Sequence, residues 1–364
     1  MSKVALVTSM TGQDSHYLVE HLLSKGYVVH GIMQCNSLLE NDFTEYEYNG
    51  QVAPGPNLYI HYGLISDPSF LMDLIITLRP DEIYNIGGGN VNYDECAAPY
   101  NSSVSTHIPA LRILEAIRFQ GLEHKVRYYH SSPSELCSLV NGININEMVT
   151  TKYCATETMA MVSDFWTVVN YRNTFGMYAC NGILYNHESP YRSERFVTRK
   201  ISKSLANITL GVEECLYLGN LNALRDWGHT RVYVKMQWSM LQQAKPEDYV
   251  FATGVQYTVR QFVIFAALAL GIKLRFVGRG IEEKGVIAAI ISPIAAALKV
   301  GDVVVAVDPR YIRMVEKSKV SANPIKARNT LGWLPETSLQ DLVIEMVQAD
   351  LASAKETIRL KKSG

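Results

Sequence analysis

The sequence predicts an α/β protein, a doubly wound parallel sheet with a smaller and partly interleaved α/β lobe. Two observations carry this prediction. Short apolar runs alternate with helical stretches through the first half of the chain, which is typical of a parallel sheet covered on both faces by crossover helices. From about Asn186 the elements become shorter, and glycine and proline punctuate them. In such a fold a ligand binds beyond the carboxyl ends of the strands.

The elements of the first half follow one another in a regular order. Val4–Val7 is a continuous apolar run that predicts a buried strand, and Ser15–Ser24 carries leucines at helical spacing. Gly26 ends that helix. Further strands are expected at residues 27–32, 58–61, 82–86, 126–130 and 181–184. Helices are expected between them, at residues 70–78, 108–120 and about 157–175.

Composition fits a globular protein and excludes several other classes. The 364 residues are 48% hydrophobic and 19% charged, which supplies a core and excludes a disordered chain. Acidic and basic residues nearly cancel (35 against 34), so nucleic acid is not an expected partner. We expect no membrane span and no signal peptide. The six cysteines are scattered, as free thiols would be in a reducing cytosol, so the expected location is cytoplasmic.

The turn after the first strand, residues 8–15, reads TSMTGQDS. A dinucleotide-binding fold places three glycines here, for a tight turn, for close approach of the pyrophosphate and for helix–strand packing. Only the middle one, Gly12, is present, because Ser9 and Ser15 replace the others. A non-glycine held at positive φ costs about 1–2 kcal/mol, and a side chain here would also crowd the pyrophosphate.

Longer segments indicate a family. They are residues 8–14 (TSMTGQD), 80–87 (PDEIYNIG), 134–136 (SEL), 186–190 (NHESP), 196–200 (FVTRK), 224–229 (LRDWGH) and 307–311 (VDPRY). In these segments the chain resembles GDP-mannose 4,6-dehydratases, which are extended short-chain dehydrogenases/reductases. The resemblance runs nearly without gaps from Met1 to about Leu351.

The resemblance implies a domain organisation and a reaction. Residues 1–185 would form the dinucleotide-binding (Rossmann) domain, residues 186–350 a substrate-binding lobe with some return to the sheet domain, and residues 351–364 a terminal tail. Family members use NADP to oxidise C4 of GDP-mannose, eliminate water across C5 and C6, and return the hydride to C6. A Thr-Ser-Glu segment and a Tyr-x-x-x-Lys pair serve this chemistry, with the lysine lowering the pKa of the tyrosine.

The Thr-Ser-Glu segment is only partly retained. Its threonine position is Pro133, which has neither a hydroxyl nor a backbone N–H. Ser134 and Glu135 stand as the family has them, so we take both as candidate catalytic residues. A purely structural hydrogen-bonding role is the alternative for Glu135.

The Tyr-x-x-x-Lys pair is absent. Without gaps, the tyrosine position falls on Glu157 and the lysine position on Met161. A slip of four residues would bring Tyr153 to the tyrosine position, but Glu157 would then replace the lysine. Glu157 is either a catalytic carboxylate that faces the cleft or a solvated helix residue, and Met161 fits packing better than function.

The cofactor side has lost several groups. The resemblance implies cofactor contacts from Gly12, Gln13, Asp14, Asn85, Gly87, His187 and Arg192. Two arginines suited to the 2′-phosphate of NADP are replaced by Gln34 and Cys35, and Leu64 replaces an aspartate near the adenine. NADP is therefore the implied cofactor, while these substitutions argue against its binding.

The substrate side is retained. The residues implied to contact a GDP-sugar are Asn186, Lys200, Arg225, Arg313 and Glu316, which suit phosphates, guanine and sugar hydroxyls. The histidines and cysteines show no spacing that predicts a metal site. The losses are thus concentrated where hydride transfer takes place, and the expected partner is GDP-mannose or a similar GDP-sugar.

Three functions remain open on this reading. The first is a family homologue that binds a GDP-sugar but is catalytically impaired or inactive. The second is an active dehydratase or related enzyme that uses Glu135 and Glu157 as its acid and base. The third is a non-enzymatic scaffold or subunit. A homodimer is expected rather than a tetramer, because the loop with Gln34 and Cys35 lacks the arginines of the family's tetramer contact.

One apolar segment, Val286–Leu298, departs from the family's more polar loop. If exposed, it would form a patch for a partner and favour the scaffold. The alternative, which we favour, is that it packs under the second lobe.

Overall fold

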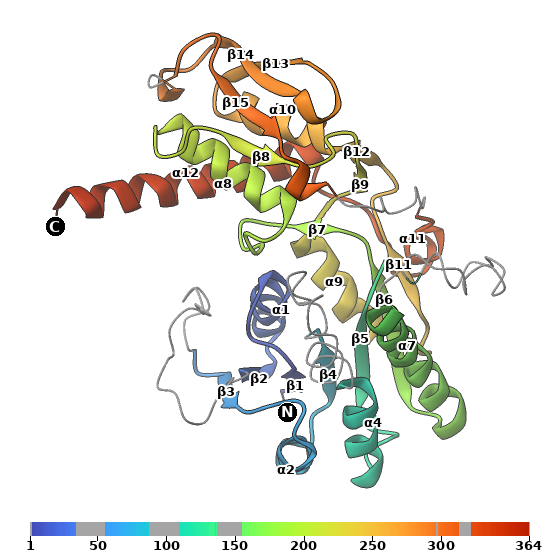
Figure 1. The fold of residues 1–364 in the computed structure, drawn as a ribbon. Helices are drawn as coiled ribbons and strands as arrows, with labels where there is room; N and C mark the ends of the chain where they lie inside the picture. The colour runs from blue at the N-terminus through green and yellow to red at the C-terminus, as the bar shows by residue number, and fades with distance from the viewer. Residues whose placement is uncertain are drawn as a thin grey trace. The chain divides into compact units, whose positions relative to one another are not determined.

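A computed structural model describes residues 2–33, 55–86, 109–134, 136, 155–295, 298–312 and 322–363 (Figure 1). The chain forms two compact units. The first, called here the sheet unit, comprises Met1–Tyr185, Thr230–Phe251 and Ala322–Leu334. The second, called the small unit, comprises Asn186–His229, Ala252–Ser321 and Pro335–Gly364.

The sheet unit is built on seven parallel strands in the order β11-β6-β5-β4-β1-β2-β3. Their bounds are β1 Val4–Val7, β2 Val28–Met33, β3 Leu58–Tyr62, β4 Glu82–Asn85, β5 Arg127–Pro133, β6 Tyr178–Leu184 and β11 Tyr249–Phe251. The order reverses at β1, between β2 and β4, as in a doubly wound sheet. The predicted fold class is confirmed.

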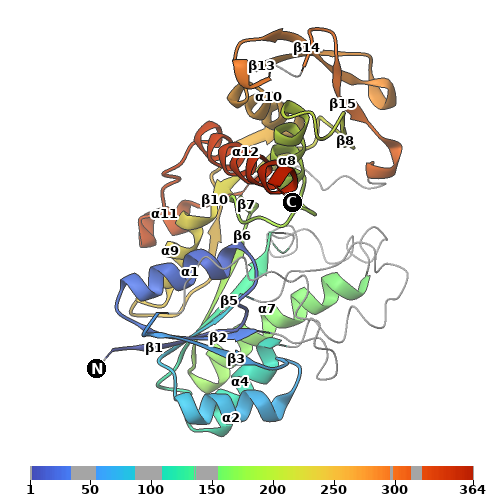
Figure 2. The same ribbon diagram turned by 90° about the vertical axis from the view of Figure 1, so that its left-hand side faces the viewer.

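Helices cover both faces of this sheet (Figure 2). They are α1 Gln13–Ser24, α2 Pro68–Leu78, α4 Pro109–Phe119, α7 Ala155–Phe175, α9 Thr230–Met240 and α11 Ile325–Leu331. α1 packs against α9, whereas α2, α4 and α7 pack side by side. A core of leucine, isoleucine, alanine and tyrosine side chains joins α2 and α4 to the sheet, with Leu6, Ile83 and Tyr128 among its buried members.

The small unit contains a four-stranded mixed sheet in the order β13-β14-β15-β8. The strands are β8 Leu216–Leu218, β13 Ile272–Val277, β14 Lys284–Ile290 and β15 Val303–Val307. Two short two-stranded sheets pair β7 His187–Glu188 with β10 Gly228–His229, and β9 Leu224–Asp226 with β12 Gln256–Thr258. The helices are α8 Val197–Thr209, α10 Val259–Ala269 and α12 Leu339–Ser363, with short 3-10 turns at η2 Gly280–Glu282, η3 Pro293–Ala295 and η4 Pro309–Tyr311.

α12 runs without interruption from Leu339 to Ser363. Residues 351–363, predicted from the sequence to form a terminal tail, are therefore part of this helix. Alanine, glutamate, lysine and arginine favour helix, and no glycine or proline interrupts the segment before Gly364.

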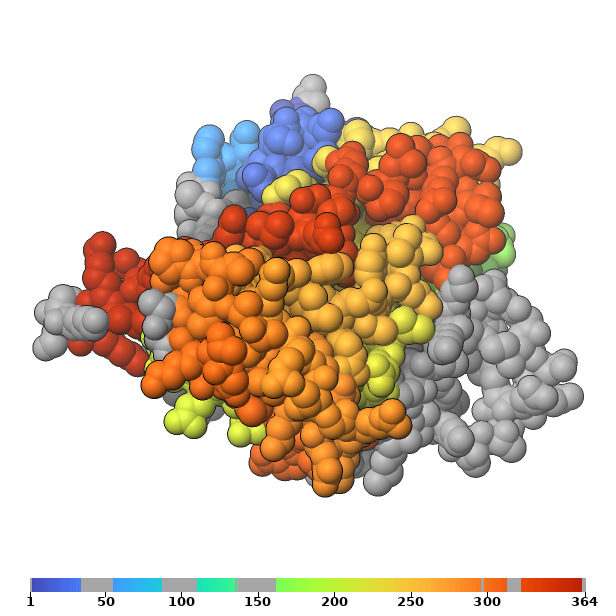
Figure 3. All heavy atoms as spheres, turned by 90° about the horizontal axis from the view of Figure 1, so that it is seen from above, coloured from blue at the N-terminus to red at the C-terminus, as the bar shows by residue number. Residues whose placement is uncertain are grey.

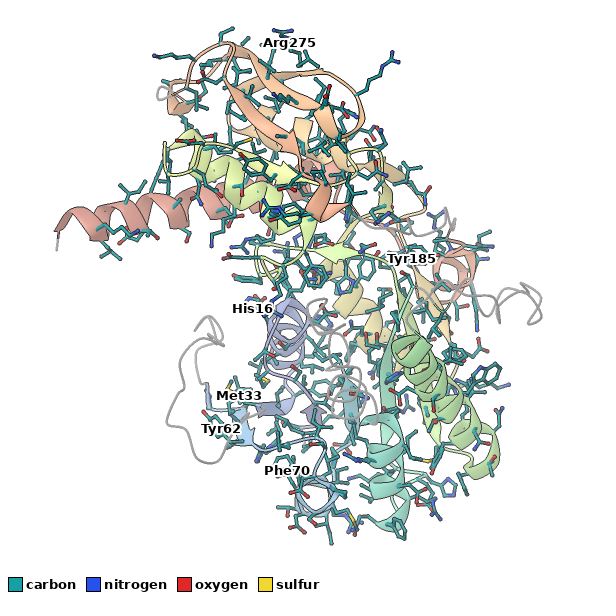
Figure 4. All side chains as sticks on the ribbon, in the orientation of Figure 1. His16, Met33, Tyr62, Phe70, Tyr185 and Arg275 are labelled. Atoms are coloured by element: carbon teal, nitrogen blue, oxygen red, sulfur yellow. The ribbon has the colours of Figure 1, made fainter. Side chains whose placement is uncertain are left out.

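The apolar segment Val286–Leu298 divides between the core and the surface of the small unit. Ile287 and Ala295 are buried in its core, whereas Ile291 is 59% exposed and Ile294 is 42% exposed. Figure 3 shows the surface formed around β13 and β14, and Arg275 of β13 extends outward into solvent (Figure 4). Over the described ranges no helix combines the length and the apolar character needed to cross a bilayer.

Candidate functional site

The first βα turn ends at Gly12, whose φ of 97° precedes α1. A Cβ at Gly12 would meet nothing within 4 Å, so the backbone conformation is what requires glycine there. Our expectation of positive-φ strain at Ser9 and Ser15 is wrong, because Arg79 is the single non-glycine with positive φ among the described residues. Ser9 Oγ lies 3.3 Å from the Thr11 carbonyl oxygen, and Ser15 Oγ donates to the Gly12 carbonyl at 2.9 Å. Both serines fit into the turn because their hydroxyl groups hydrogen-bond to its backbone carbonyl oxygens.

The next two residues belong to the first turn of α1. Gln13 is buried, and Asp14 accepts a hydrogen bond from Gln237 Nε2 of α9 at 3.3 Å. A carboxylate in the first turn also stabilises the positive end of the helix dipole. Asp14 therefore holds α1 against α9 within the sheet unit.

Asn85, at the end of β4, is the centre of a buried polar network. Its Oδ1 accepts from Thr8 Oγ1 at 3.0 Å, and its Nδ2 lies 2.9 Å from Tyr128 Oη and 3.1 Å from His130 Nδ1. An amide nitrogen only donates, so His130 Nδ1 accepts and its proton is on Nε2. Burial lowers the pKa of His130 to about 4, which keeps it neutral. Both amide protons of Asn85 are engaged with the sheet.

The carboxyl end of β5 carries the segment in which the sequence predicts an altered Thr-Ser-Glu motif. Pro133 is the last residue of β5 and lies opposite Leu184 of β6. Ser132 is buried, and its Oγ lies 3.4 Å from Asn181 Oδ1. Ser134 follows the strand directly. The strand end therefore carries a proline, which has neither a hydroxyl nor a backbone N–H.

α7 carries the two positions at which the sequence predicts the loss of the Tyr-x-x-x-Lys pair. Glu157 and Met161 lie one turn apart near its start, and their side chains are outside the described residues. Asp164, one turn further on, is only 8% exposed, and burial raises the pKa of its carboxyl to about 7. Asp164 is not among the residues predicted from the sequence. The sequence pattern that could have indicated its burial is a single acidic residue next to Phe165 and one turn before the core residue Val168.

In the small unit, the retained NHESP segment forms β7 and the turn after it. Asn186 accepts a backbone hydrogen bond from Gly228 at 3.0 Å, and His187 opens β7, which pairs with β10. Arg192 forms an ion pair with buried Glu188, with Nε and Oε2 3.1 Å apart. Its guanidinium carbon lies 3.4 Å from the centroid of the Phe196 ring. Arg192 is thus held in place within the small unit.

Two retained cations lie on α8 and β9. Lys200 Nζ is 3.4 Å from the centroid of the Tyr311 ring. Arg225 Nη1 donates to the Leu224 carbonyl at 2.7 Å. Asp226, beside Arg225, is buried and accepts hydrogen bonds from the loop at residues 253–254.

Several predicted residues are not described by the structure. Gly87, Glu135, Arg313 and Glu316 fall in its gaps, as do Gln34, Cys35 and Tyr153. In the described part of the chain, no group of three or more histidine, cysteine, aspartate and glutamate residues is arranged to hold a metal ion.

The fold places the protein in a class. UDP-glucose 4-epimerase from Thermotoga maritima superposes with a TM-score of 0.71 at 16% identity, covering 98% of this chain and 99% of that one. dTDP-glucose 4,6-dehydratase from Bacillus anthracis, in complex with NAD, gives a TM-score of 0.68 at 17% identity, covering 97% and 98%. The chain thus shares the fold of these sugar-nucleotide epimerases and dehydratases.

Within that class the family is also defined. The family model for GDP-mannose 4,6 dehydratase matches residues 6–346. GDP-mannose 4,6-dehydratase from Vibrio cholerae serotype O1 is 48% identical, over 100% of this chain and 97% of the relative. The enzyme of that name from Yersinia enterocolitica is 47% identical, again over 100% and 97%. The chain belongs to the GDP-mannose 4,6-dehydratase family, which confirms the resemblance found in its motifs.

Proposed function

We propose that the chain is a cytoplasmic member of this family that binds a GDP-sugar but has little or no dehydratase turnover. One observation carries the proposal: β5 ends at Pro133. Proline supplies neither the hydroxyl nor the N–H of the threonine that the family places there. Glu157 and Met161 on α7, at the tyrosine and lysine positions, remove the phenol and the ammonium as well.

The loss of these groups sets the expected rate. Bound NADP would supply the hydride acceptor, and the open turn at Gly12 with the N-terminal N–H groups of α1 fits its pyrophosphate. The chain must still take a proton from the sugar hydroxyl. Each general acid or base typically contributes about 10²–10⁴-fold, so losing the phenol and the lysine that tunes it would leave turnover very slow.

The substrate side supports retained binding. Lys200 and Arg225 are cations on α8 and β9 of the small unit, suited to the phosphates of a GDP-sugar. Asn186 precedes β7, next to the β7–β10 pair. In this proposal the protein is a homodimer, since the loop with Gln34 and Cys35 lacks the arginines of the family's tetramer contact.

Calorimetry and a product assay test the proposal together. We expect micromolar binding of GDP-mannose, and no 4-keto product when GDP-mannose and NADP are supplied. The triple variant Pro133→Thr, Glu157→Tyr, Met161→Lys should then restore turnover by at least about 100-fold.

The matched control for this variant carries Glu157→Phe in place of Glu157→Tyr. It differs by one phenol oxygen and should stay inactive. A wild-type chain that forms the 4-keto product at the rate of its relatives would refute the loss of turnover, and absence of GDP-mannose binding would refute the binding role.

A further inference from the structure

The turn that carries Tyr311 is fixed by the strands before it. β15 ends at Val307 and pairs in parallel with β8, and the Asp308 N–H donates to the Leu218 carbonyl at 2.8 Å. The Asp308 carboxylate then accepts from the Arg310 backbone N–H at 2.9 Å and from Arg310 Nη2 at 2.6 Å. The start of η4 Pro309–Tyr311 is therefore fixed by the bond from Asp308 to β8 and by the Asp308 side-chain cap.

A glycine on the neighbouring segment allows the backbone of this turn to lie in close contact with it. A Cβ at Gly219, just after β8, would collide with the Tyr311 carbonyl oxygen. Backbone can approach backbone this closely only at glycine. The position of Tyr311 thus follows from the β8–β15 pair and from Gly219, both inside the small unit.

Lys200 reaches the Tyr311 ring from a different element. α8 is anchored to α12 through Asp350, which accepts from Arg199 Nη2 at 2.7 Å and from Ser202 Oγ at 2.6 Å. Lys200 Nζ then lies 3.4 Å from the Tyr311 ring centroid. Tyr311 is 50% exposed, so the ring is not simply a core side chain.

We propose that Tyr311 is a positioning residue that holds the Lys200 ammonium for the diphosphate of a nucleotide sugar. This inference rests on the proposed function and adds a residue to it. Lysine has four flexible carbons, and a cation over an aromatic face loses much of that freedom before ligand arrives. One or two ammonium protons face the ring, and the rest stay available to phosphate oxygens.

Calorimetry with GDP and with guanosine tests the inference. Tyr311→Leu removes the ring and should weaken GDP binding by about 3- to 30-fold while leaving guanosine binding unchanged. Tyr311→Phe keeps the ring and should rescue GDP binding to within about twofold. In a Lys200→Met background, Tyr311→Leu should cause no further loss, because the two residues act through one contact.

Tyr217 offers a matched control. It lies on β8 of the small unit and is 48% exposed, so Tyr217→Leu removes a similarly exposed ring from the same unit and should leave GDP binding unchanged. Equal loss of GDP and guanosine binding in Tyr311→Leu would show a structural role and overturn the inference. Unchanged GDP binding in that variant would overturn it as well.

A second measurement separates this inference from the proposed function. After reductive ¹³C-methylation of lysines, the Lys200 methyl signal, assigned with Lys200→Arg, should show an upfield ring-current shift. Tyr311→Leu should abolish the shift and Tyr311→Phe should keep it. An unshifted signal in the wild type overturns the inference and leaves the proposed nucleotide binding untouched. A shifted signal without GDP binding overturns the proposed function and the ligand named here.

Discussion

Asp164 is a buried acid on α7 whose pKa burial raises from 3.8 to about 7. The folded chain therefore holds this proton more tightly than the unfolded chain does. Stability from this group is fully present below about pH 3.8 and is lost as the pH rises to about 7, because the folded state must then bury a charge.

Asp164→Asn should accordingly stabilise the protein, and the gain should grow as the pH rises. We expect a gain on the order of 2–4 kcal/mol in the free energy of unfolding at pH 8, and a smaller gain at pH 5, measured by urea denaturation. Asp73→Asn, at an exposed position of α2, is the control and should change stability by less than about 0.5 kcal/mol. A gain that is the same at both pH values would contradict this origin.

Single residues show what sequence could and could not predict. The absence of a side-chain hydroxyl and a backbone N–H at Pro133 is visible in the sequence, because proline lacks both groups whatever its surroundings, and the loss of turnover inferred from it stays a prediction. The strain expected at Ser9 and Ser15 was wrong, because φ depends on how the whole turn is built. Asp164 was missed for a related reason: its pKa depends on which side of α7 meets the sheet.

At the scale of elements, α12 is joined to α8 by a buried carboxylate. Asp350 is only 3% exposed and accepts hydrogen bonds from Arg199 and Ser202 of α8. Removing one partner of a buried ion pair leaves the other charge desolvated and unpaired, which costs more than the pair itself contributes.

Asp350→Ala should therefore destabilise the small unit by about 3–5 kcal/mol, measured by guanidinium denaturation. The control is Glu356→Ala on the exposed side of the same helix, where we expect less than about 1 kcal/mol. Equal losses in the two variants would show that the Asp350 contacts add nothing beyond helix propensity.

The elements themselves were predicted unevenly. Strands such as Val4–Val7 and Glu82–Asn85 were expected within a residue, because apolar runs between helices are local signals. The seventh strand, β11, was not identified, since its place beside β6 is a long-range pairing of residue 249 with residue 182. The end of α12 coincides with the predicted terminal segment, whose residues favour helix.

At the scale of the whole molecule, family membership and the reaction depend on very different numbers of residues. The chain is 47–48% identical to two family enzymes over its full length, and its seven-stranded sheet has a doubly wound order. Core positions far outnumber reacting ones, so identity measures mainly the fold. The reaction depends on a few groups, and the loss of turnover that we propose rests on three positions, 133, 157 and 161.

The sheet unit also contains two buried groups whose contributions to folding stability change with pH in opposite directions. Burial lowers the pKa of His130 from 6.5 to about 4, so its contribution to stability is present above about pH 6.5 and is lost as the pH falls to about 4. Asp164 acts in the opposite direction, losing stability as the pH rises from about 3.8 to about 7. The two should largely cancel between pH 4 and 6.5.

Removing Asp164 should therefore expose the effect of His130. In Asp164→Asn we expect unfolding stability to fall by about 3 kcal/mol at most between pH 7 and pH 4, measured by urea denaturation. Adding His130→Gln should flatten this profile, because glutamine keeps an acceptor for Asn85 and does not titrate. If both variants lost the same stability on acidification, groups other than His130 would cause the loss of stability at low pH. The inference that His130 is buried and neutral would then be wrong.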